Sequence, residues 1–410
     1  MSTIKAFRGI RPRKDLVSRI AALPYDVYNR EEAKAEVEKE PLSFLKIDRP
    51  ETQFPDTMNM YASCVYEKAK ETLRAMIEDH SFQKEEEDAY YIYELTRNRK
   101  VQTGIVACAS IDDYLENRIK KHENTREEKE IDRITHVDQC SAQTGPIFLA
   151  YRAKQEIDEI VERVKKETPE YDFTSVDGVT HRVWVMNGKK DMERIYHEFQ
   201  TMDSIYIADG HHRAASAVKV GMKRRKENPD YTGKEEFNYF LSVLFPDNQL
   251  MIMDYNRVVK DLNGLTEKEF LKILEDKFQI EKKEGAYKPE EKGKMGMYLS
   301  KNWYELTAKP EIRKNHPVDG LDAAILQNEV LAPILEIKDP KTDKRIDFVG
   351  GIRGLGELEK RCAEDMALAF SLYPTSIEEL FQVADAELLM PPKSTWFEPK
   401  LRSGIFIHEI

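Results

Sequence analysis

Apolar side chains recur at helical spacing between residues 57 and 79, with charged residues between them. Spacings of three and four residues place side chains on one face of an α-helix, so this segment predicts an amphipathic helix that packs on a core. Its apolar positions are Tyr61, Val65, Leu73, Met76 and Ile77. Further helices are predicted over residues 153–167, 191–199, 266–278 and 322–335.

Short apolar runs predict strands elsewhere in the chain. Residues 89–95 and 103–109 flank a polar run, which is typical of a β-hairpin. A second hairpin is expected from residues 237–245 and 249–258, because a Pro-Asp-Asn turn signal separates them. Strands are also predicted over residues 179–186, 204–208 and 297–306. The segment 116–138 is almost wholly polar and fits a solvated helix or a loop over a cleft equally well.

These elements predict an α+β protein with a mixed sheet and flanking helices. The length of 410 residues favours two domains. We expect a boundary near Asp261, which gives a catalytic region over residues 1–260 and a C-terminal α+β region over residues 261–410. The absence of a Gly/Ser-rich linker predicts that the two regions pack closely.

Composition and charge narrow the class of protein. The formal charge of −11 repels a phosphodiester backbone and speaks against nucleic acid as a partner. No apolar run reaches the roughly 18 to 20 residues needed to cross a bilayer, and the first residues lack a signal peptide, so we expect a cytoplasmic protein without a membrane partner. The four cysteines stand far apart, which predicts reduced thiols and no zinc or dithiol centre.

The strongest chemical signal is a strand followed by a sharp turn and a helix. The apolar run 204–208 leads into Asp209-Gly210-His211-His212-Arg213, and small helix-favouring residues follow. A helix N-terminus that carries Arg213 and two imidazoles suits a phosphate or a carboxylate. Asp209 is a candidate to hold Mg²⁺ or accept a proton. The alternative is structural, with Asp209 as a helix cap and the histidines in local hydrogen bonds.

A second candidate for phosphate binding is the sequence Lys393-Ser394-Thr395, which combines a cation with two hydroxyls after a Pro-Pro pair. The alternative is a packed C-terminal strand with a surface lysine. The chain contains no Walker sequence, and the glycines between residues 351 and 356 do not match the dinucleotide pattern G-x-G-x-x-G. A P-loop or Rossmann assignment is therefore unsupported.

The run Asp-Gly-His-His-Arg-Ala-Ala-Ser-Ala at residues 209–217 resembles the strand–turn–helix signature of the ParB/sulfiredoxin superfamily. Further motifs match, in order, a bacterial and archaeal domain-of-unknown-function family in that superfamily: Leu23–Val27, His122-Glu123, Asp132-Arg133, Gly145–Phe148 and Met390–Thr395. The match covers nearly the whole chain. It implies a ParB/sulfiredoxin-like core with N-terminal and C-terminal elaborations. Over this core the family is similar to the free serine kinases, which phosphorylate L-serine with ADP or ATP.

The resemblance implies roles for the His122-Glu123 pair and for the turn at residues 209–213. Glu123, in the His122-Glu123 pair, would activate the acceptor hydroxyl, and residues 209–213 would contact the nucleotide phosphate and the metal. Without the resemblance, Glu123 is one acid in a charged segment and fits a solvated helical face. The chain departs from its relatives in a wider separation between the pair and the turn, in Gly145 where a Ser is frequent and in Gln143 where an Asn is common. The amino-acid pocket is not transferable.

The leading hypothesis is therefore a kinase that uses ADP or ATP with Mg²⁺ to phosphorylate serine or a similar small hydroxyl compound. Phosphoryl transfer mainly needs alignment, charge neutralisation and a group that orients the attacking hydroxyl, and each has a candidate here. The alternative is a nucleotide-responsive ParB-like binding or regulatory protein without turnover, but no basic helix-turn-helix module is evident. Sulfiredoxin chemistry is disfavoured because the turn has histidines where sulfiredoxin has a cysteine.

Overall fold

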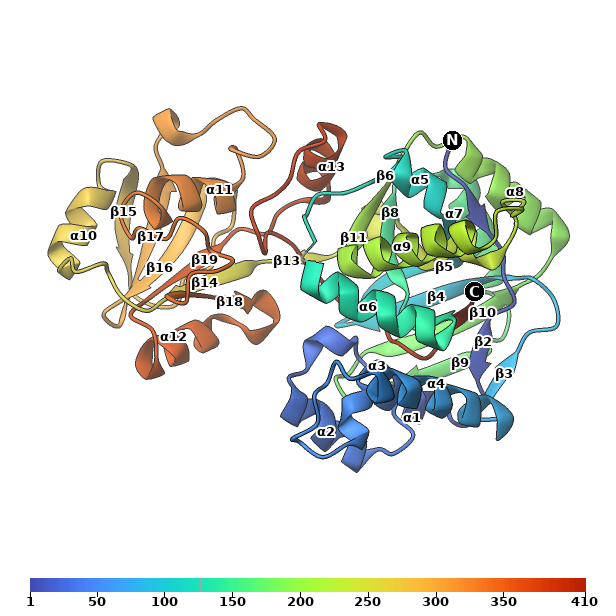
Figure 1. The fold of residues 1–410 in the computed structure, drawn as a ribbon. Coiled ribbons are helices and arrows are strands. Elements are labelled where there is room, and N and C mark those ends of the chain that lie inside the picture. The colour runs from blue at the N-terminus through green and yellow to red at the C-terminus, as the bar shows by residue number, and fades with distance from the viewer. Residues whose placement is uncertain (126) are drawn as a thin grey trace. The chain divides into compact units, whose positions relative to one another are not determined.

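The computed structural model describes residues 1–125 and 127–410 (Figure 1). In these residues the chain forms two compact units: the first combines Met1–Leu250 with Pro399–Ile410, and the second is Met251–Glu398. The predicted α+β fold class with a mixed sheet and flanking helices is confirmed. The predicted ranges 1–260 and 261–410 differ from these units. The strands at residues 252–259 join the second unit, and the C-terminal segment returns to the first.

The first unit is built on a mixed sheet with the order β6-β11-β8-β12-β5-β4-β10-β9, and β1 pairs with β5 outside this path. The β11–β6 and β12–β8 pairs are parallel and the other pairs are antiparallel. Its strands are β1 (Ile4–Lys5), β4 (Tyr90–Arg97), β5 (Lys100–Ser110), β6 (Ile119–Lys120), β8 (Ile147–Tyr151), β9 (Tyr171–Thr174), β10 (Thr180–Met186), β11 (Ile205–Asp209) and β12 (Tyr239–Pro246).

Helices cover this sheet and bury its apolar side chains. In Figure 1, α6 and α9 lie together over the sheet, and α4 packs against α6. The helices are α1 (Val17–Ile20), α2 (Arg30–Lys39), α3 (Leu45–Asp48), α4 (Ser63–Glu78), α5 (Ile111–Leu115), α6 (Glu127–Cys140), α7 (Gln155–Val164), α8 (Lys189–Gln200) and α9 (His211–Glu227). The helices predicted near residues 57–79, 153–167 and 191–199 correspond to α4, α7 and α8. The undecided segment 116–138 forms β6 and most of α6.

Two small ribbons complete the first unit. Strand β2 (Ile10–Pro12) pairs with β3 (Phe82–Lys84), and β7 (Ala142–Gln143) pairs with β21 (His408–Glu409). The second ribbon anchors the C-terminal segment, which also bridges to Ile10. Because these backbone pairs lie within the first unit, the last residues of the chain belong to the same body as the turn after β11.

The second unit is an antiparallel sheet with the order β15-β17-β16-β19-β14-β18. Its strands are β14 (Tyr255–Val259), β15 (Phe278–Lys283), β16 (Lys294–Leu299), β17 (Asn302–Ala308), β18 (Ile346–Gly350) and β19 (Leu368–Leu372), with a separate ribbon of β13 (Ile252–Met253) and β20 (Trp396–Phe397). Its helices are α10 (Glu267–Leu274), α11 (Asp322–Leu326), α12 (Leu355–Glu364) and α13 (Ile377–Asp385).

One predicted hairpin is wrong. Residues 239–246 and 255–259 form strands, but β12 pairs with β5 and β8 in the first unit, whereas β14 pairs with β18 and β19 in the second. The Pro-Asp-Asn sequence between them forms a short 3₁₀ helix at Asp247–Gln249, and the boundary between units follows it. A turn signal between two apolar runs therefore marks a unit boundary here.

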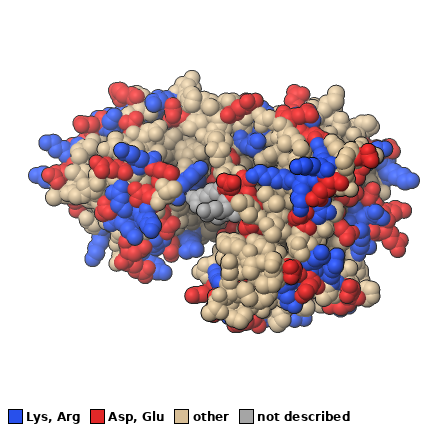
Figure 2. All heavy atoms as spheres, viewed as in Figure 1, with Lys and Arg blue, Asp and Glu red and all other residues tan. Residues whose placement is uncertain are grey.

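Charged side chains are intermixed on the face of the molecule in Figure 2, where basic and acidic residues alternate over the surface. Among the residues that the structure describes, none of the helices combines the length and the apolar character that a membrane crossing requires.

Candidate functional site

The carboxyl ends of β6 and β11 lie side by side. The two strands are parallel and in register, with Ile205 opposite Ile119 and Tyr206 opposite Lys120. Because parallel neighbours end at the same edge of a sheet, the segments that follow them leave from one place. These segments begin with His122-Glu123 and with the turn at residues 209–213. The two sequence motifs, far apart along the chain, therefore meet at this edge.

A contact between two imidazoles confirms this meeting. The ring centroids of His122 and His211 lie 4.5 Å apart, and the rings are perpendicular. Both side chains are buried, and neither His122 Nδ1 nor His211 Nε2 has a hydrogen-bond partner among the described residues. Burial lowers the pKa of His122 to about 4 and holds the pKa of His211 well below its ordinary value. Both imidazoles are neutral at pH 7, so His211 does not supply the positive charge that the sequence predicted for it at the helix N-terminus.

The turn itself depends on Gly210. Its φ of +94° lies in the left-handed region that glycine adopts without a Cβ penalty. A Cβ at this position would stand 3.1 Å from the Nε and Nη2 atoms of Arg213. The glycine is therefore needed twice, for the backbone conformation and for the close approach of the guanidinium.

Three charged groups meet at this turn. The carboxylate of Asp209 lies 3.2 Å from Lys400 Nζ and 3.7 Å from Arg213 Nη2, and it also accepts a hydrogen bond from the Gly210 backbone. Burial would raise the pKa of Asp209, but the charges of Lys400 and Arg213 outweigh it and hold that pKa below its usual range. Two cations against one carboxylate leave this cluster with a net positive charge.

Arg213 connects the turn to another matched motif. Its Nη1 donates a hydrogen bond to the Pro146 carbonyl, and the same guanidinium passes 3.7 Å from the Cβ position of Gly145. A Ser at residue 145 would add its side chain beside Arg213 and Ser403. Gln143, the other departure, bonds the Tyr239 carbonyl and the Leu241 amide at the start of β12. Gln143 therefore has a structural role.

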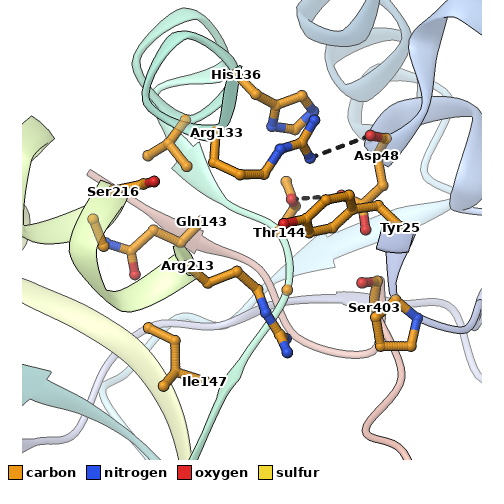
Figure 3. Close-up of a pocket in the computed structure, with 14 residues that line it drawn as sticks. Tyr25, Asp48, Arg133, His136, Gln143, Thr144, Ile147, Arg213, Ser216 and Ser403 are labelled. Carbon is orange, nitrogen blue, oxygen red and sulfur yellow. Dashed lines mark hydrogen bonds between the residues drawn. The ribbon is translucent and has the colours of Figure 1, made fainter. Parts of the chain in front are cut away.

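A small cavity lies beside Arg213, between α6, α9 and the N-terminal segment (Figure 3). Arg133 from α6 stacks over the ring of Tyr25 at 4.1 Å and donates to the Asp48 carbonyl, while Thr144 donates to the Asp48 carboxylate at 2.7 Å. The cavity encloses only about 30 Å³, little more than one water molecule occupies. The matched motifs at residues 23–27, 132–133, 145–148 and 209–217 thus surround one small space.

The remaining predicted site residues lie in a loop and a helix of the first unit and in a segment of the second unit. Glu123 is partly buried in the loop between β6 and α6, and His212 is partly buried in the first turn of α9. Lys393, Ser394 and Thr395 belong to the second unit. There Lys393 Nζ lies 5.6 Å from the centre of the Tyr255 ring, and Ser394 donates to the Pro391 carbonyl at 2.7 Å. A contact between this segment and a phosphate stays a prediction.

The side chains at the turn provide few ligands for a metal ion held by the protein alone. In the part of the chain that the structure describes, His, Cys, Asp and Glu side chains nowhere gather in a group of three that could hold one. Asp209 brings one carboxylate, which Lys400 and Arg213 already contact. Mg²⁺ typically binds proteins through one or two carboxylates together with substrate phosphates. The residues at the turn therefore suit a metal that arrives with a nucleotide better than one held by the protein alone.

Sequence reasoning missed Lys400, because nothing in the sequence indicates that the C-terminal segment returns to the turn after β11. It also gave Tyr25 and Arg133 no role, although both belong to matched motifs. Asp48 and Ser403 carried no signal. These side chains gather through long-range packing of the first unit, which local periodicity does not encode.

A protein family and several solved structures resemble this chain. Residues 4–324 match the family described as "Protein of unknown function (DUF1015)". No curated protein matches the sequence. Similar solved structures include SbnI with a C-terminal truncation from Staphylococcus aureus (11% identity, TM-score 0.39), and the match covers 72% of this chain and 82% of the SbnI chain. The match to a free serine kinase in complex with AMP (14% identity, TM-score 0.35) covers 74% of this chain and 91% of the kinase chain. The match to a conserved hypothetical protein from Pyrococcus furiosus (14% identity, TM-score 0.36) covers 74% of this chain and 94% of that protein. Because the family model spans most of its length, the chain belongs to the DUF1015 family.

Proposed function

We propose that this protein is a nucleotide-dependent phosphotransferase that acts on the hydroxyl of a small molecule, serine or a relative of it. The observation that carries the proposal is the meeting of two separate motifs at one sheet edge, where β6 and β11 end in parallel and His122 contacts His211. Phosphoryl transfer requires such a meeting, because a group that orients the acceptor must lie near the groups that hold the phosphate. The sequence resemblance to serine kinases supplies the acceptor class.

The turn is the proposed phosphate site. The backbone N–H groups at the start of α9 are free of helical partners and attract anions, and the cluster of Asp209, Arg213 and Lys400 carries a net positive charge. Gly210 lets a phosphate approach the backbone closely, and His212 stands in the first turn of the same helix. Mg²⁺, when bound with the nucleotide, neutralises phosphate charge, and Asp209 is the residue placed to contact it.

Glu123 is the proposed group for the acceptor. The acceptor oxygen forms a bond to the terminal phosphorus as the bond to the bridging oxygen breaks, and AMP leaves from ADP or ADP leaves from ATP. The hydroxyl proton passes to the Glu123 carboxylate. His122 acts as a positioning residue, because its neutral ring packs on His211, bonds to the Ile207 backbone and fixes the start of the Glu123 loop.

The test is an assay with purified protein, ADP or ATP, Mg²⁺ and a panel of hydroxy amino acids, with phosphorylated product detected by ³¹P NMR. Glu123→Gln is expected to lower turnover by roughly 100-fold to 10,000-fold, the range for a positioned base. Glu127→Gln is the matched control, because it removes the same charge from an exposed position nearby. No product with any donor and acceptor would reject the proposal, and equal losses in the two variants would reject the role of Glu123.

A further inference from the structure

A larger cavity lies in the first unit, next to the one in Figure 3. It encloses about 280 Å³, enough for a small organic molecule, and shares Tyr25 and Arg133 with its smaller neighbour. Its walls come from the 3₁₀ turn at Tyr25–Val27, from residues 49–66 and from α6. No residue of the proposed phosphate turn lines it.

The walls of this cavity are rich in aromatic rings. Four tyrosines line it: Tyr25, Tyr28, Tyr61 and Tyr66. Tyr66 is buried and donates its hydroxyl to Asp132 at 2.8 Å, whereas Tyr61 is 59% exposed. A tyrosine ring presents a negative electrostatic face, so a group of such rings attracts a cation. The exposed ring of Tyr61 is the one most available to a ligand entering from solvent.

Both arginines in the cavity wall are already neutralised. Arg49 donates to Glu51 at 2.6 Å and to the carbonyls of Tyr25 and Tyr28. Arg133 donates to Asp132 at 2.9 Å and lies against the Tyr25 ring. Each guanidinium is therefore paired with a carboxylate and bonded to backbone carbonyl oxygen, so its positive charge is already balanced within the wall. The wall therefore differs from the phosphate turn, where two cations face one carboxylate.

One carboxylate in the wall has no such compensation. Asp26 lines the cavity, and its carboxylate takes part in no hydrogen bond or ion pair with the rest of the described chain. Its carboxylate adds a third negative charge to those of Glu51 and Asp132, against two arginines, so the wall carries a formal charge of −1. Its one uncompensated charge is thus negative and belongs to Asp26, an exposed residue beside Tyr25.

We propose that this cavity binds a small organic cation, a primary or quaternary ammonium compound. The ammonium group lies against the tyrosine rings and is balanced by Asp26. The aromatic wall and the uncompensated carboxylate favour this class over an anion or a neutral compound, and the volume of the cavity suits a small molecule. The evidence for this site is independent of the proposed phosphoryl transfer, because it comes from residues outside the phosphate turn.

The test is a binding experiment with the full chain, which needs neither nucleotide nor turnover. Choline and ethanolamine are titrated by isothermal calorimetry, with 3,3-dimethylbutan-1-ol as the neutral counterpart of choline and acetate as the anion. At least one ammonium compound is expected to bind, about tenfold or more tightly than the neutral alcohol. Equal affinity for choline and the alcohol would overturn the proposal, and so would binding of acetate alone or the absence of binding by both ammonium compounds.

Two exposed positions locate the site without endangering the fold. Tyr61→Ala removes one ring and Asp26→Asn removes the charge, and each is expected to weaken ammonium binding about threefold to tenfold. Tyr196→Ala on α8 and Asp230→Asn after α9 are matched controls that lie outside the cavity and should leave the affinity unchanged. Raised salt should weaken binding to the native protein more than to Asp26→Asn. Unchanged affinity in both cavity variants would place the cation elsewhere and refute the assignment.

Discussion

Replacing Gly210 with alanine separates two contributions of this glycine to the proposed phosphate site. Its φ of +94° imposes a backbone penalty on any other residue. Its missing Cβ also leaves room for the Arg213 guanidinium, two of whose nitrogens would lie 3.1 Å from the new methyl group. Gly178 in the β9–β10 turn offers a matched control in the same unit, because its φ is +78° and nothing lies within 4 Å of its Cβ position.

The expected magnitudes follow from this pair. Gly178→Ala should cost only the left-handed conformation, about 1 to 2 kcal/mol. Gly210→Ala should cost the same amount plus the displacement of Arg213 from the Pro146 carbonyl and from Asp209. Hydrogen bonds of charged groups contribute about 1.5 to 3 kcal/mol, and a shift of a few tenths of an ångström weakens them only in part. We therefore expect Gly210→Ala to destabilise the first unit by about 1 kcal/mol more than the control does.

The assay is a urea series in which hydrogen exchange of peptides from β5 and β12 reports the unfolding free energy of the first unit alone. The double variant Gly210→Ala with Arg213→Ala closes a thermodynamic cycle, in which the extra loss should disappear once the guanidinium is gone. Nucleotide affinity should fall in Gly210→Ala and stay unchanged in Gly178→Ala. An equal loss of stability in the two single variants, with no coupling to Arg213, would refute the close approach on which the geometry of the turn rests.

Two further predictions concern burial and packing in the first unit. The pKa of His122 is about 4 in the folded chain against about 6.5 unfolded. Above pH 6.5 the imidazole is neutral in both states. Between pH 6.5 and 4 only the unfolded chain takes up the proton, so the unfolding free energy decreases as the pH is lowered. His122→Phe should reduce this decrease by up to about 3 kcal/mol in acid unfolding curves, and curves that run parallel for the two proteins would contradict the assignment. Gly221→Ala in α9 should destabilise by about 1 to 3 kcal/mol, although alanine normally stabilises a helix, because its Cβ would meet the Phe237 carbonyl oxygen at 2.4 Å. Gly356→Ala in α12, which meets nothing within 4 Å, should instead raise the unfolding free energy, and the same sign at both positions would contradict the packing argument.

The local pattern of apolar and polar residues predicted helices and strands correctly where periodicity or composition gave a clear signal. The apolar face of α4 and the buried strand before Gly210 follow from periodicity and composition, and both are present. The pattern failed at residues 249–258, because a strand run does not specify its partner and the pairing of β14 depends on strands about 90 to 110 residues away. The polar segment 116–138 stayed undecided because it holds a two-residue strand and a helix with little apolar content.

The candidate site was predictable only in part, for a related reason. Motif resemblance identified the pair at His122-Glu123 and the turn at residues 209–213, and the parallel β6–β11 register explains why they meet. The charge state of the histidines was not predictable, since it depends on burial that no local pattern reveals. Lys400 was equally hidden, because it reaches Asp209 from 191 positions along the chain.

The balance of charge at the turn shows how these missed features act together. With His122 and His211 neutral, the cluster of Asp209, Arg213 and Lys400 at the start of α9 still has a net positive charge. Asp209 lies between the two cations where a phosphate oxygen would also be attracted, so an arriving anion competes with this carboxylate for Arg213 and Lys400. A divalent cation carried by the nucleotide relieves that competition, because it gives Asp209 a new partner while the two basic side chains turn to the phosphate. In the proposed enzyme, nucleotide and metal ion should therefore bind cooperatively at this turn, and substitution of Asp209 by Asn should remove most of that cooperativity.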